Sequence, residues 1–203
     1  MDNSIVIKKY KNSVTRKYIY VSNDEIDTLQ KGNYWFSRKI DGQLWFYCKT
    51  NNNSKIINSN ENDISNLVKD IKKDLDKKLS KSKNIILAGE LYFLTKDRER
   101  YGDTISALGD NSKKKNLRLG IFDVVVSDKF LSNFEKKYNF LKKTLGKNLK
   151  DFSHVFEHKK IKQKEINKLF KEIVIKNNAE GLIIKNDNVV YKIKKEETAD
   201  LLI

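Results

Sequence analysis

Runs in which apolar and polar residues alternate cover much of the chain. Such runs predict strands, because successive side chains of a strand point to opposite faces of a sheet. Aromatic and β-branched residues, which strands favour, are concentrated in the same runs. The strands predicted in this way are residues 4–8, 17–22, 34–40, 44–47, 85–93, 117–126, 181–184 and 189–194.

Apolar residues recur every three or four positions in other stretches, and this spacing predicts helices. In residues 63–79 the expected N-cap is Asp63. Ser132 and Glu135 have the spacing of a capping box at the start of a second helix, whose apolar positions run from Phe134 to Leu145. The remaining predicted elements are a third helix at residues 166–174, a short helix at 23–29 and a polar turn region at 51–60.

Strands in antiparallel pairs with helices between them predict an α+β fold. A chain of 203 residues is long enough for one domain with a sizeable core. No stretch has the composition of a linker, and no internal repeat is visible. We therefore predict a single domain over residues 1–203.

The charge of the chain is strongly positive. Lys and Arg number 42 against 27 Asp and Glu, which gives a formal net charge of +15. An acidic partner is expected, and nucleic acid, an anionic membrane and a polyphosphate ligand all fit. Lys greatly outnumbers Arg, so a compositional bias towards Lys and Asn explains part of the charge.

Cysteine and histidine give little indication of a metal site. Cys48 is the one cysteine, so the chain has no disulfide framework and no cysteine-based zinc site. His154 and His158 stand four residues apart, and we interpret them as part of a polar surface segment rather than as a metal pair. No apolar run is long enough to span a bilayer. We expect a soluble, cytoplasmic protein with no membrane partner.

Charged residues interrupt or adjoin several of the apolar strands, where burying them is costly unless they are paired or used. Together they fit a nucleoside triphosphate, because lysines neutralise phosphates and carboxylates hold a divalent cation. Each also has a structural interpretation. Asp41-Gly42 resembles a hairpin turn, Glu90 could be a paired core carboxylate, and Lys192 with Lys194 could form a solvated strand face.

The order of these residues along the chain is more specific than any one of them. The motifs are Lys39-Ile40-Asp41-Gly42, Gly89-Glu90-Leu91, Phe122-Asp123, Glu180-Gly181-Leu182-Ile183-Ile184-Lys185 and Lys192-Ile193-Lys194. From about Tyr34 to the C-terminus this series resembles the covalent nucleotidyltransferases, the superfamily of ATP-dependent DNA ligases, RNA ligases and mRNA capping enzymes. The resemblance implies an α+β, ATP-grasp-like ligase nucleotidyltransferase domain with antiparallel sheets flanked by helices.

The resemblance also implies roles for particular residues. Lys39 would be the nucleophile that attacks the α-phosphate of ATP and carries AMP as a phosphoramidate, and it must lose its proton before it attacks. Lys192 and Lys194 would neutralise the α-phosphate and stabilise the charge that develops in transfer. Asp41 and Gly42 would shape the loop that presents Lys39.

Three further residues complete the implied ATP site. Glu90 would bind the ribose and Phe122 would stack on adenine. Glu180 would bind a divalent metal, with Mg²⁺ or Mn²⁺ as the cofactor, since these ions prefer oxygen ligands. Asp123 is expected to be a metal ligand or a structural partner rather than a base.

The chain departs from the DNA ligase pattern at the first motif and at its end. Many DNA ligases have an arginine two residues after the motif glycine, whereas this chain has Leu44, as in some RNA ligases. Residues 198–202 resemble the exit towards an oligonucleotide-binding (OB) domain. We expect that C-terminal OB domain to be absent from this chain, which alone would bind adenylate but react poorly with ATP.

The expected substrate is a nicked nucleic acid. Arg98 and Arg100 lie in a charged segment and are candidates for phosphate contacts, although a solvated loop is nearly as good an interpretation. Lysine runs at 69–83, 113–115 and 159–164 would add salt-dependent affinity for the backbone. We predict a monomeric ATP-dependent DNA ligase that transfers AMP to a 5′-phosphate at a nick. The alternatives are an RNA ligase or RNA-repair enzyme, a capping enzyme, and a non-catalytic nucleic-acid-binding module.

Overall fold

The computed structural model describes residues 2–14 and 17–195. The chain divides into two compact units. Unit 1 comprises Met1–Lys17 and Ile40–Glu157, and unit 2 comprises Tyr18–Lys39 and His158–Ile203. Whether both units act as the single domain expected over residues 1–203 stays a prediction. The exit segment at residues 198–202 lies outside the described residues.

Unit 1 is built on a five-stranded sheet in the order β4-β3-β5-β6-β7. Its pairings are antiparallel except that of β6 with β7. The long strands at its centre agree with the two strongly apolar runs of the sequence. The strands are β3 (Gln43–Thr50), β4 (Asn53–Ile57), β5 (Asn84–Phe93), β6 (Leu117–Ser127) and β7 (Ser153–Val155).

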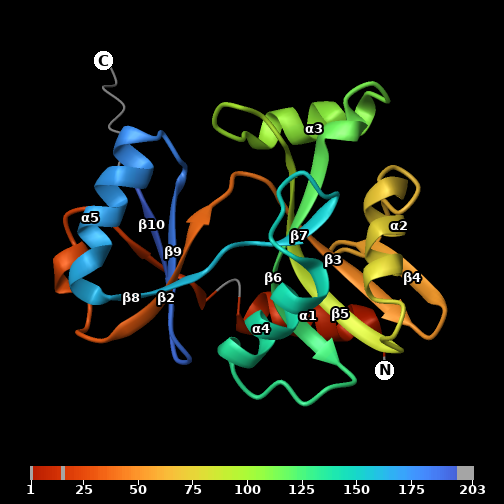
Figure 1. Cartoon of the computed structure of the whole chain (residues 1–203), viewed down its shortest axis with the longest axis horizontal. Coiled ribbons are helices and arrows are strands. Elements are labelled where there is room, and N and C mark those ends of the chain that lie inside the picture. The colour runs from red at the N-terminus through yellow and green to blue at the C-terminus, as the bar shows by residue number, and fades with distance from the viewer. Residues whose placement is uncertain (1, 15–16, 196–203) are drawn as a thin grey trace. The chain divides into compact units, whose positions relative to one another are not determined.

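Four α-helices belong to unit 1 within the described residues, and Figure 1 shows them around its sheet. Two of them were expected, whereas no helix was predicted at residues 3–13 or at residues 101–109. The short helix η3 (Lys114–Asn116) leads into β6. The α-helices are α1 (Asn3–Ser13), α2 (Lys69–Lys78), α3 (Tyr101–Gly109) and α4 (Phe134–Leu145).

The strand predicted at residues 4–8 is wrong, because this segment is part of α1. Asp2 caps the helix by accepting a hydrogen bond from the backbone N–H of Ser4 at 2.9 Å. Ile7 and Tyr10, three residues apart, are buried against apolar side chains of the sheet, which include Phe46. The residues that α1 buries are therefore spaced as in a helix. Residues 4–8 taken alone also fit the apolar–polar alternation of a strand.

Three other local predictions for unit 1 need correction. The polar turn region at residues 51–60 contains strand β4. Helix α2 begins at Lys69 rather than near Asp63, whose side chain accepts a hydrogen bond from the backbone N–H of Ser65 at 2.8 Å. Asn133, not Ser132, caps α4, since its side chain accepts from the backbone N–H of Lys136.

The histidines were predicted on a polar surface segment, and this prediction is wrong. His154 lies on β7 with 0% of its surface exposed, and His158, in unit 2, is also buried. His154 Nε2 is 3.2 Å from the hydroxyl of Tyr92, and Phe156 packs against the imidazole ring. Burial lowers the pKa of His154 to about 4, because a charged imidazolium loses its hydration there.

Unit 2 contains a second five-stranded sheet, in the order β1-β10-β9-β2-β8. Only the pairing of β1 with β10 is parallel among the pairings described for this sheet. The strands predicted at residues 17–22, 34–40, 181–184 and 189–194 are present in it. The strands are β1 (Ile19–Val21), β2 (Asn33–Lys39), β8 (Lys159–Lys162), β9 (Gly181–Lys185) and β10 (Val190–Lys194).

One face of this second sheet is covered by the helix predicted at residues 166–174. The helix begins with η4 (Gln163–Glu165), continues as α5 (Ile166–Phe170) and ends in the π-helical turn η5 (Lys171–Lys176). Its buried residues join Tyr34, Phe36 and other apolar side chains of the strands in one core. The short helix predicted at 23–29 is present as η2 (Ile26–Thr28).

The α+β class is confirmed, since the described residues form five α-helices and two sheets. None of the helices among them is both long and apolar enough to cross a membrane. In unit 2 the sheet face opposite α5 is where side chains for chemistry can project. That face contains Lys39, Lys192 and Lys194, because strand side chains alternate between faces.

Candidate active site

Three motifs that are far apart in the sequence meet at one end of the unit 2 sheet. Lys39 is the last residue of β2 and pairs with Gly181, the first residue of β9. Gly181 pairs on its other side with Lys194, the last residue of β10. Lys39 and Lys194 therefore flank the start of β9, which Glu180 immediately precedes.

Glu180 joins the two lysines through ion pairs. Its Oε2 accepts a hydrogen bond from Nζ of Lys39, and its Oε1 lies 2.5 Å from Nζ of Lys194. Only 7% of the Glu180 side chain is exposed. Burial disfavours the carboxylate, but the hydrogen bonds and charges of Lys194 and Lys39 outweigh burial and hold the pKa of Glu180 below its usual value.

Gly181 is required by the close approach of neighbouring backbone. A Cβ atom at this position would lie 2.3 Å from the carbonyl oxygen of Ile193 and 3.3 Å from Cγ of Lys194. Any larger residue would push β10 away from β9. The glycine after Glu180 thus keeps Lys194 within reach of the carboxylate.

Lys192 projects from the same face of β10 as Lys194, as predicted. Its ammonium nitrogen lies 4.5 Å from the centre of the Tyr18 ring, a cation–π geometry. The sequence interpretation gave Tyr18 no role. An aromatic residue immediately before β1, which pairs with β10, is the signal that indicates it.

The rest of the first motif lies in unit 1, since the unit boundary falls between Lys39 and Ile40. Gly42 allows close packing against β5. A Cβ atom on Gly42 would lie 2.4 Å from the carbonyl oxygen of Leu91 and 2.8 Å from Cγ of Glu90. Gly42 of the first motif therefore lies against the Glu90 motif. Asp41 immediately precedes Gly42 in the chain.

Phe122 occupies an irregular position on β6. Gly89 of β5 pairs with Ile121, but the next residue, Ala88, pairs with Asp123, so Phe122 is the extra residue of a β-bulge. Its ring is half-buried and packs against the apolar cluster that includes the α1 residue Tyr10. The stacking of Phe122 on adenine stays a prediction.

Asp123 has structural partners on two helices. Its Oδ2 accepts a hydrogen bond from the hydroxyl of Tyr10 on α1 at 2.8 Å, and its Oδ1 accepts one from Nζ of Lys137 on α4 at 3.0 Å. Oδ1 also accepts from the backbone N–H of Val124. Of the two roles expected for Asp123, these contacts support the structural one.

The two arginines proposed for nucleic acid lie in the loop between β5 and α3, as the sequence interpretation allowed. Arg100 is the N-cap residue, and its carbonyl oxygen accepts a hydrogen bond from the backbone N–H of Asp103 at 3.1 Å. Its side chain is exposed, while that of Arg98 is half-buried. Phosphate contacts by either arginine stay a prediction.

The donor set for a divalent metal ion near Lys39 is small among the described residues. Among the described residues no cluster of three or more His, Cys, Asp or Glu side chains could hold one. Both oxygens of Asp123 accept hydrogen bonds from protein groups, and its expected role as a metal ligand stays a prediction. Glu180 fits as a single carboxylate ligand, because Mg²⁺ is commonly bound by one or two carboxylates with water and substrate phosphates.

Comparisons with known proteins agree on a ligase fold. Mycobacterial DNA ligase D complexed with ATP and MES is 12% identical with a TM-score of 0.60, and the match covers 89% of this chain and 61% of that one. The ATP-dependent DNA ligase of bacteriophage T7 in complex with ATP is 15% identical with a TM-score of 0.54, covering 92% and 67%. An archaeal ATP-dependent RNA ligase is 10% identical with a TM-score of 0.57, covering 84% and 44%.

These identities show the fold, which confirms the expected ligase nucleotidyltransferase architecture. The chain spans about half the length of the solved ligase Pmar-Lig_Pre, of which it covers 48% at 16% identity and a TM-score of 0.63, with 94% of this chain matched. No curated protein matches the sequence. The family model described as ATP dependent DNA ligase domain matches residues 17–202. This chain therefore belongs to the ATP-dependent DNA ligase domain family.

Proposed function

We propose that this chain catalyses adenylyl transfer for an ATP-dependent DNA ligase, with Lys39 as the nucleophile. The observation that supports it most directly is the convergence of Lys39 and Lys194 on Glu180. These residues come from three separate motifs, and their ion pairs bring two cationic groups to one end of a sheet. The family membership supports ATP as the nucleotide.

In the proposed reaction Nζ of Lys39 forms a bond to the α-phosphorus of ATP. The ammonium proton of Lys39 passes to water, the bond between the α-phosphorus and the bridging oxygen breaks, and pyrophosphate leaves. AMP is then transferred to a 5′-phosphate at a nick, and the adjacent 3′-hydroxyl displaces it. Lys194 and Lys192 would stabilise the negative charge that gathers on the α-phosphate.

Glu180 would have two partners in this scheme. Without nucleotide it holds the Lys39 side chain in an ion pair. When bound, Mg²⁺ or Mn²⁺ would draw electron density from the phosphate oxygens. Glu180 would help to hold that ion, and its contact with Lys39 would have to loosen. The roles of Glu90 at the ribose and Phe122 at adenine belong to the same proposal.

Intact-mass spectrometry tests the nucleophile. The chain is incubated with ATP and Mg²⁺ over an extended time course, because it is expected to react poorly alone. A slow mass increase of one adenylyl group should appear, and peptide mapping should locate it on Lys39. Lys39→Arg keeps the positive charge beside Glu180 but cannot form the same adduct, so it is the matched control. An adduct on another lysine, or one that persists in Lys39→Arg, would refute the assignment.

Lys194→Ala is a second test with a different readout. It removes one of the two cations beside Glu180, so adduct formation should slow by about 10²-fold or more, as for loss of a group that stabilises transition-state charge. ATP binding should weaken much less. Equal rates in wild type and variant would show that Lys194 takes no part in the reaction.

The DNA substrate is proposed over RNA because the family model is that of a DNA ligase domain. Leu44 favours the alternative, an RNA ligase, since arginine is common at this position in DNA ligases. In the structure Leu44 packs against the apolar cluster beneath α1, so it offers no polar contact to a substrate. Transfer of AMP from the preformed adduct to nicked DNA or nicked RNA separates the two, and faster transfer to RNA would overturn the DNA assignment.

A further inference from the structure

The ammonium group of Lys192 in unit 2 lies against the aromatic ring of Tyr18. Its nitrogen is 4.5 Å from the centre of the ring. A cation at this distance from an aromatic face is attracted by the negative face of the ring quadrupole. Because the ring has no net charge, this contact holds the ammonium group without neutralising it.

The pairing of β1 with β10 brings the ring to this place. The two strands are parallel, with Tyr20 opposite Lys192 and Val21 opposite Ile193. Val21 and Ile193 are both part of the core of unit 2, so Tyr20 and Lys192 project from the other face of the sheet. Tyr18 immediately precedes β1 and contacts Lys192 on that same face.

Two tyrosines thus lie close to Lys192 in the sheet, and they differ in their surroundings. Tyr18 is half-buried and has its ring at the ammonium group. Tyr20 is 55% exposed, and within the described part of the chain its ring has no contact with Lys192. Since both have the same side chain and lie two residues apart, Tyr20 is a matched control for Tyr18.

We propose that Tyr18 is a positioning residue that holds the ammonium group of Lys192 in place for the α-phosphate of the nucleotide. The inference rests on the proposed function, in which Lys192 binds that phosphate. A lysine side chain is long and flexible, and ordering it on the ring before the nucleotide arrives lowers the entropic cost of binding. The aromatic face provides this effect, so phenylalanine can replace Tyr18 and leucine cannot.

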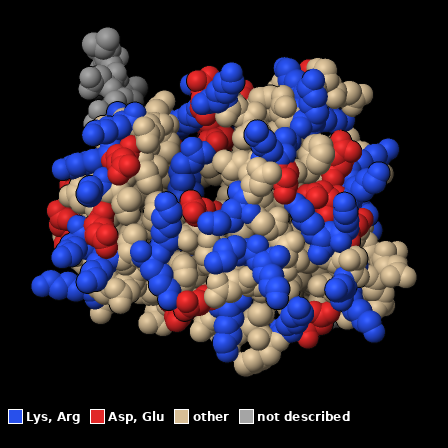
Figure 2. Space-filling model, viewed as in Figure 1, with Lys and Arg blue, Asp and Glu red and all other residues tan. Residues whose placement is uncertain are grey.

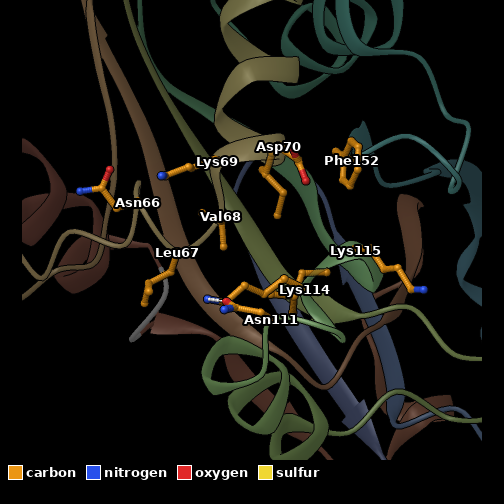
Figure 3. A pocket seen from close by; sticks show the side chains of 11 residues that line it. Asn66, Leu67, Val68, Lys69, Asp70, Asn111, Lys114, Lys115 and Phe152 are labelled. Carbon is orange, nitrogen blue, oxygen red and sulfur yellow. Dashed lines mark hydrogen bonds between the residues drawn. The ribbon is translucent and has the colours of Figure 1, made fainter.

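Other parts of the chain also attract a nucleotide, and the test has to separate them from Lys192. Lys and Arg are abundant over the visible surface (Figure 2), and each attracts an anion weakly. Unit 1 has a pocket of about 360 Å³, lined by residues 66–71 at the start of α2 and by residues around η3. In its lining Nζ of Lys114 donates a hydrogen bond to Oδ1 of Asn111 at 2.8 Å (Figure 3).

The affinities for AMP and adenosine together isolate the phosphate contact. The two ligands differ only in the 5′-phosphate, so the dissociation constant for adenosine divided by that for AMP measures what the phosphate adds. Isothermal titration calorimetry of the full chain at one salt concentration gives both values and does not require Lys39 to react. Tyr18→Leu should lower this ratio by about 3- to 30-fold, the range of a cation–π interaction, and leave the adenosine affinity unchanged.

Four variants provide the controls. Tyr18→Phe keeps the ring and should keep the wild-type ratio. Tyr20→Leu removes the exposed tyrosine opposite Lys192, and Lys114→Ala removes a cation of the unit 1 pocket, so both should also keep it. When Lys192→Ala is already present, Tyr18→Leu should have no further effect on the ratio, because the lysine that the ring positions is gone.

Three results would overturn the inference. An unchanged ratio in Tyr18→Leu, or the same loss with and without Lys192, would show that the ring does not act through this lysine. Parallel losses of AMP and adenosine affinity would give Tyr18 a structural role only. A wild-type chain that binds AMP no more tightly than adenosine would also overturn it, and the adduct on Lys39 then tells separately whether adenylyl transfer itself fails.

Discussion

The buried imidazole of His154 predicts a loss of stability in mild acid. Its pKa is about 4 in the folded chain and 6.5 in the unfolded one. Between these values the unfolded chain binds the extra proton, so stability is complete above pH 6.5 and falls as the pH drops towards 4. A difference of this size corresponds to about 3 kcal/mol, because one pH unit between the two values is worth about 1.4 kcal/mol.

The surroundings of His154 explain why the neutral form is favoured. Desolvation by burial is the main cause of the low pKa, and the positive charges of Lys78 and Arg118 act in the same direction. The carboxylate of Asp151 opposes them. The hydroxyl of Tyr92 lies 3.2 Å from Nε2 and can donate to the neutral ring, but a protonated ring would have to offer its own proton there.

The prediction is tested by comparing wild type with His154→Gln. Glutamine does not titrate and can still accept from the Tyr92 hydroxyl. Because Trp45 is in unit 1 and Trp35 in unit 2, both proteins carry Trp35→Phe so that tryptophan fluorescence reports unit 1. Urea denaturation gives the free energy of unfolding of both proteins at each pH. The difference between wild type and variant should be about 3 kcal/mol smaller at pH 4 than at pH 7, because only the wild type loses stability through His154.

A direct titration provides the control. The chain has two histidines, so the variant identifies the ring signals of His154 in proton NMR. Its pKa should lie near 4. A value near 6.5, or a stability difference that is the same at both pH values, would show that the buried ring is not held neutral.

Three further predictions concern packing and burial. Tyr10→Phe removes the hydroxyl that donates to Asp123, so the free energy of unfolding of unit 1 should fall by about 1 kcal/mol, while Tyr20→Phe, at an exposed position in unit 2, should change little in urea denaturation. Gly181→Ala should lower the stability of unit 2 by about 1–3 kcal/mol and reduce adduct formation. Gly102→Ala is its control, because nothing lies within 4 Å of the added Cβ, and equal effects would refute the packing argument. Burial raises the pKa of Cys48 to about 12, so its thiol should react with Ellman's reagent at pH 8 only after unfolding, and rapid reaction of the native chain would contradict this.

The sequence predicted the strands that present the motifs because strong apolar alternation and tertiary burial favour the same structure there. The strands ending at Lys39 and Lys194 are examples. Helix α1 was missed because its apolar residues fit a helix only once Ile7 and Tyr10 have a sheet to pack against. Local spacing does not contain that information.

The position of the unit boundary shows a second limit of sequence patterns. Lys39 closes a strand of unit 2, and Asp41 and Gly42 belong to unit 1, yet the four-residue motif is continuous in the sequence. Nothing in its apolar pattern marks a change of unit. The order of motifs along the chain, which resembles a family, predicted that Lys39 and Glu180 act together, and spacing alone did not.

The lysine excess was ambiguous in the sequence because charge counts do not identify partners. In the structure Lys78 binds Asp74 and Asp151, and Lys137 binds Asp123, so these lysines stabilise the fold. Lys49 is buried and donates to the carbonyl oxygen of Leu79 at 2.8 Å. A composition bias would place lysines on all exposed surfaces alike. The lysines named above differ from such a bias, because each is held by a particular carboxylate or carbonyl oxygen within unit 1 and so contributes to the fold rather than to a free positive surface.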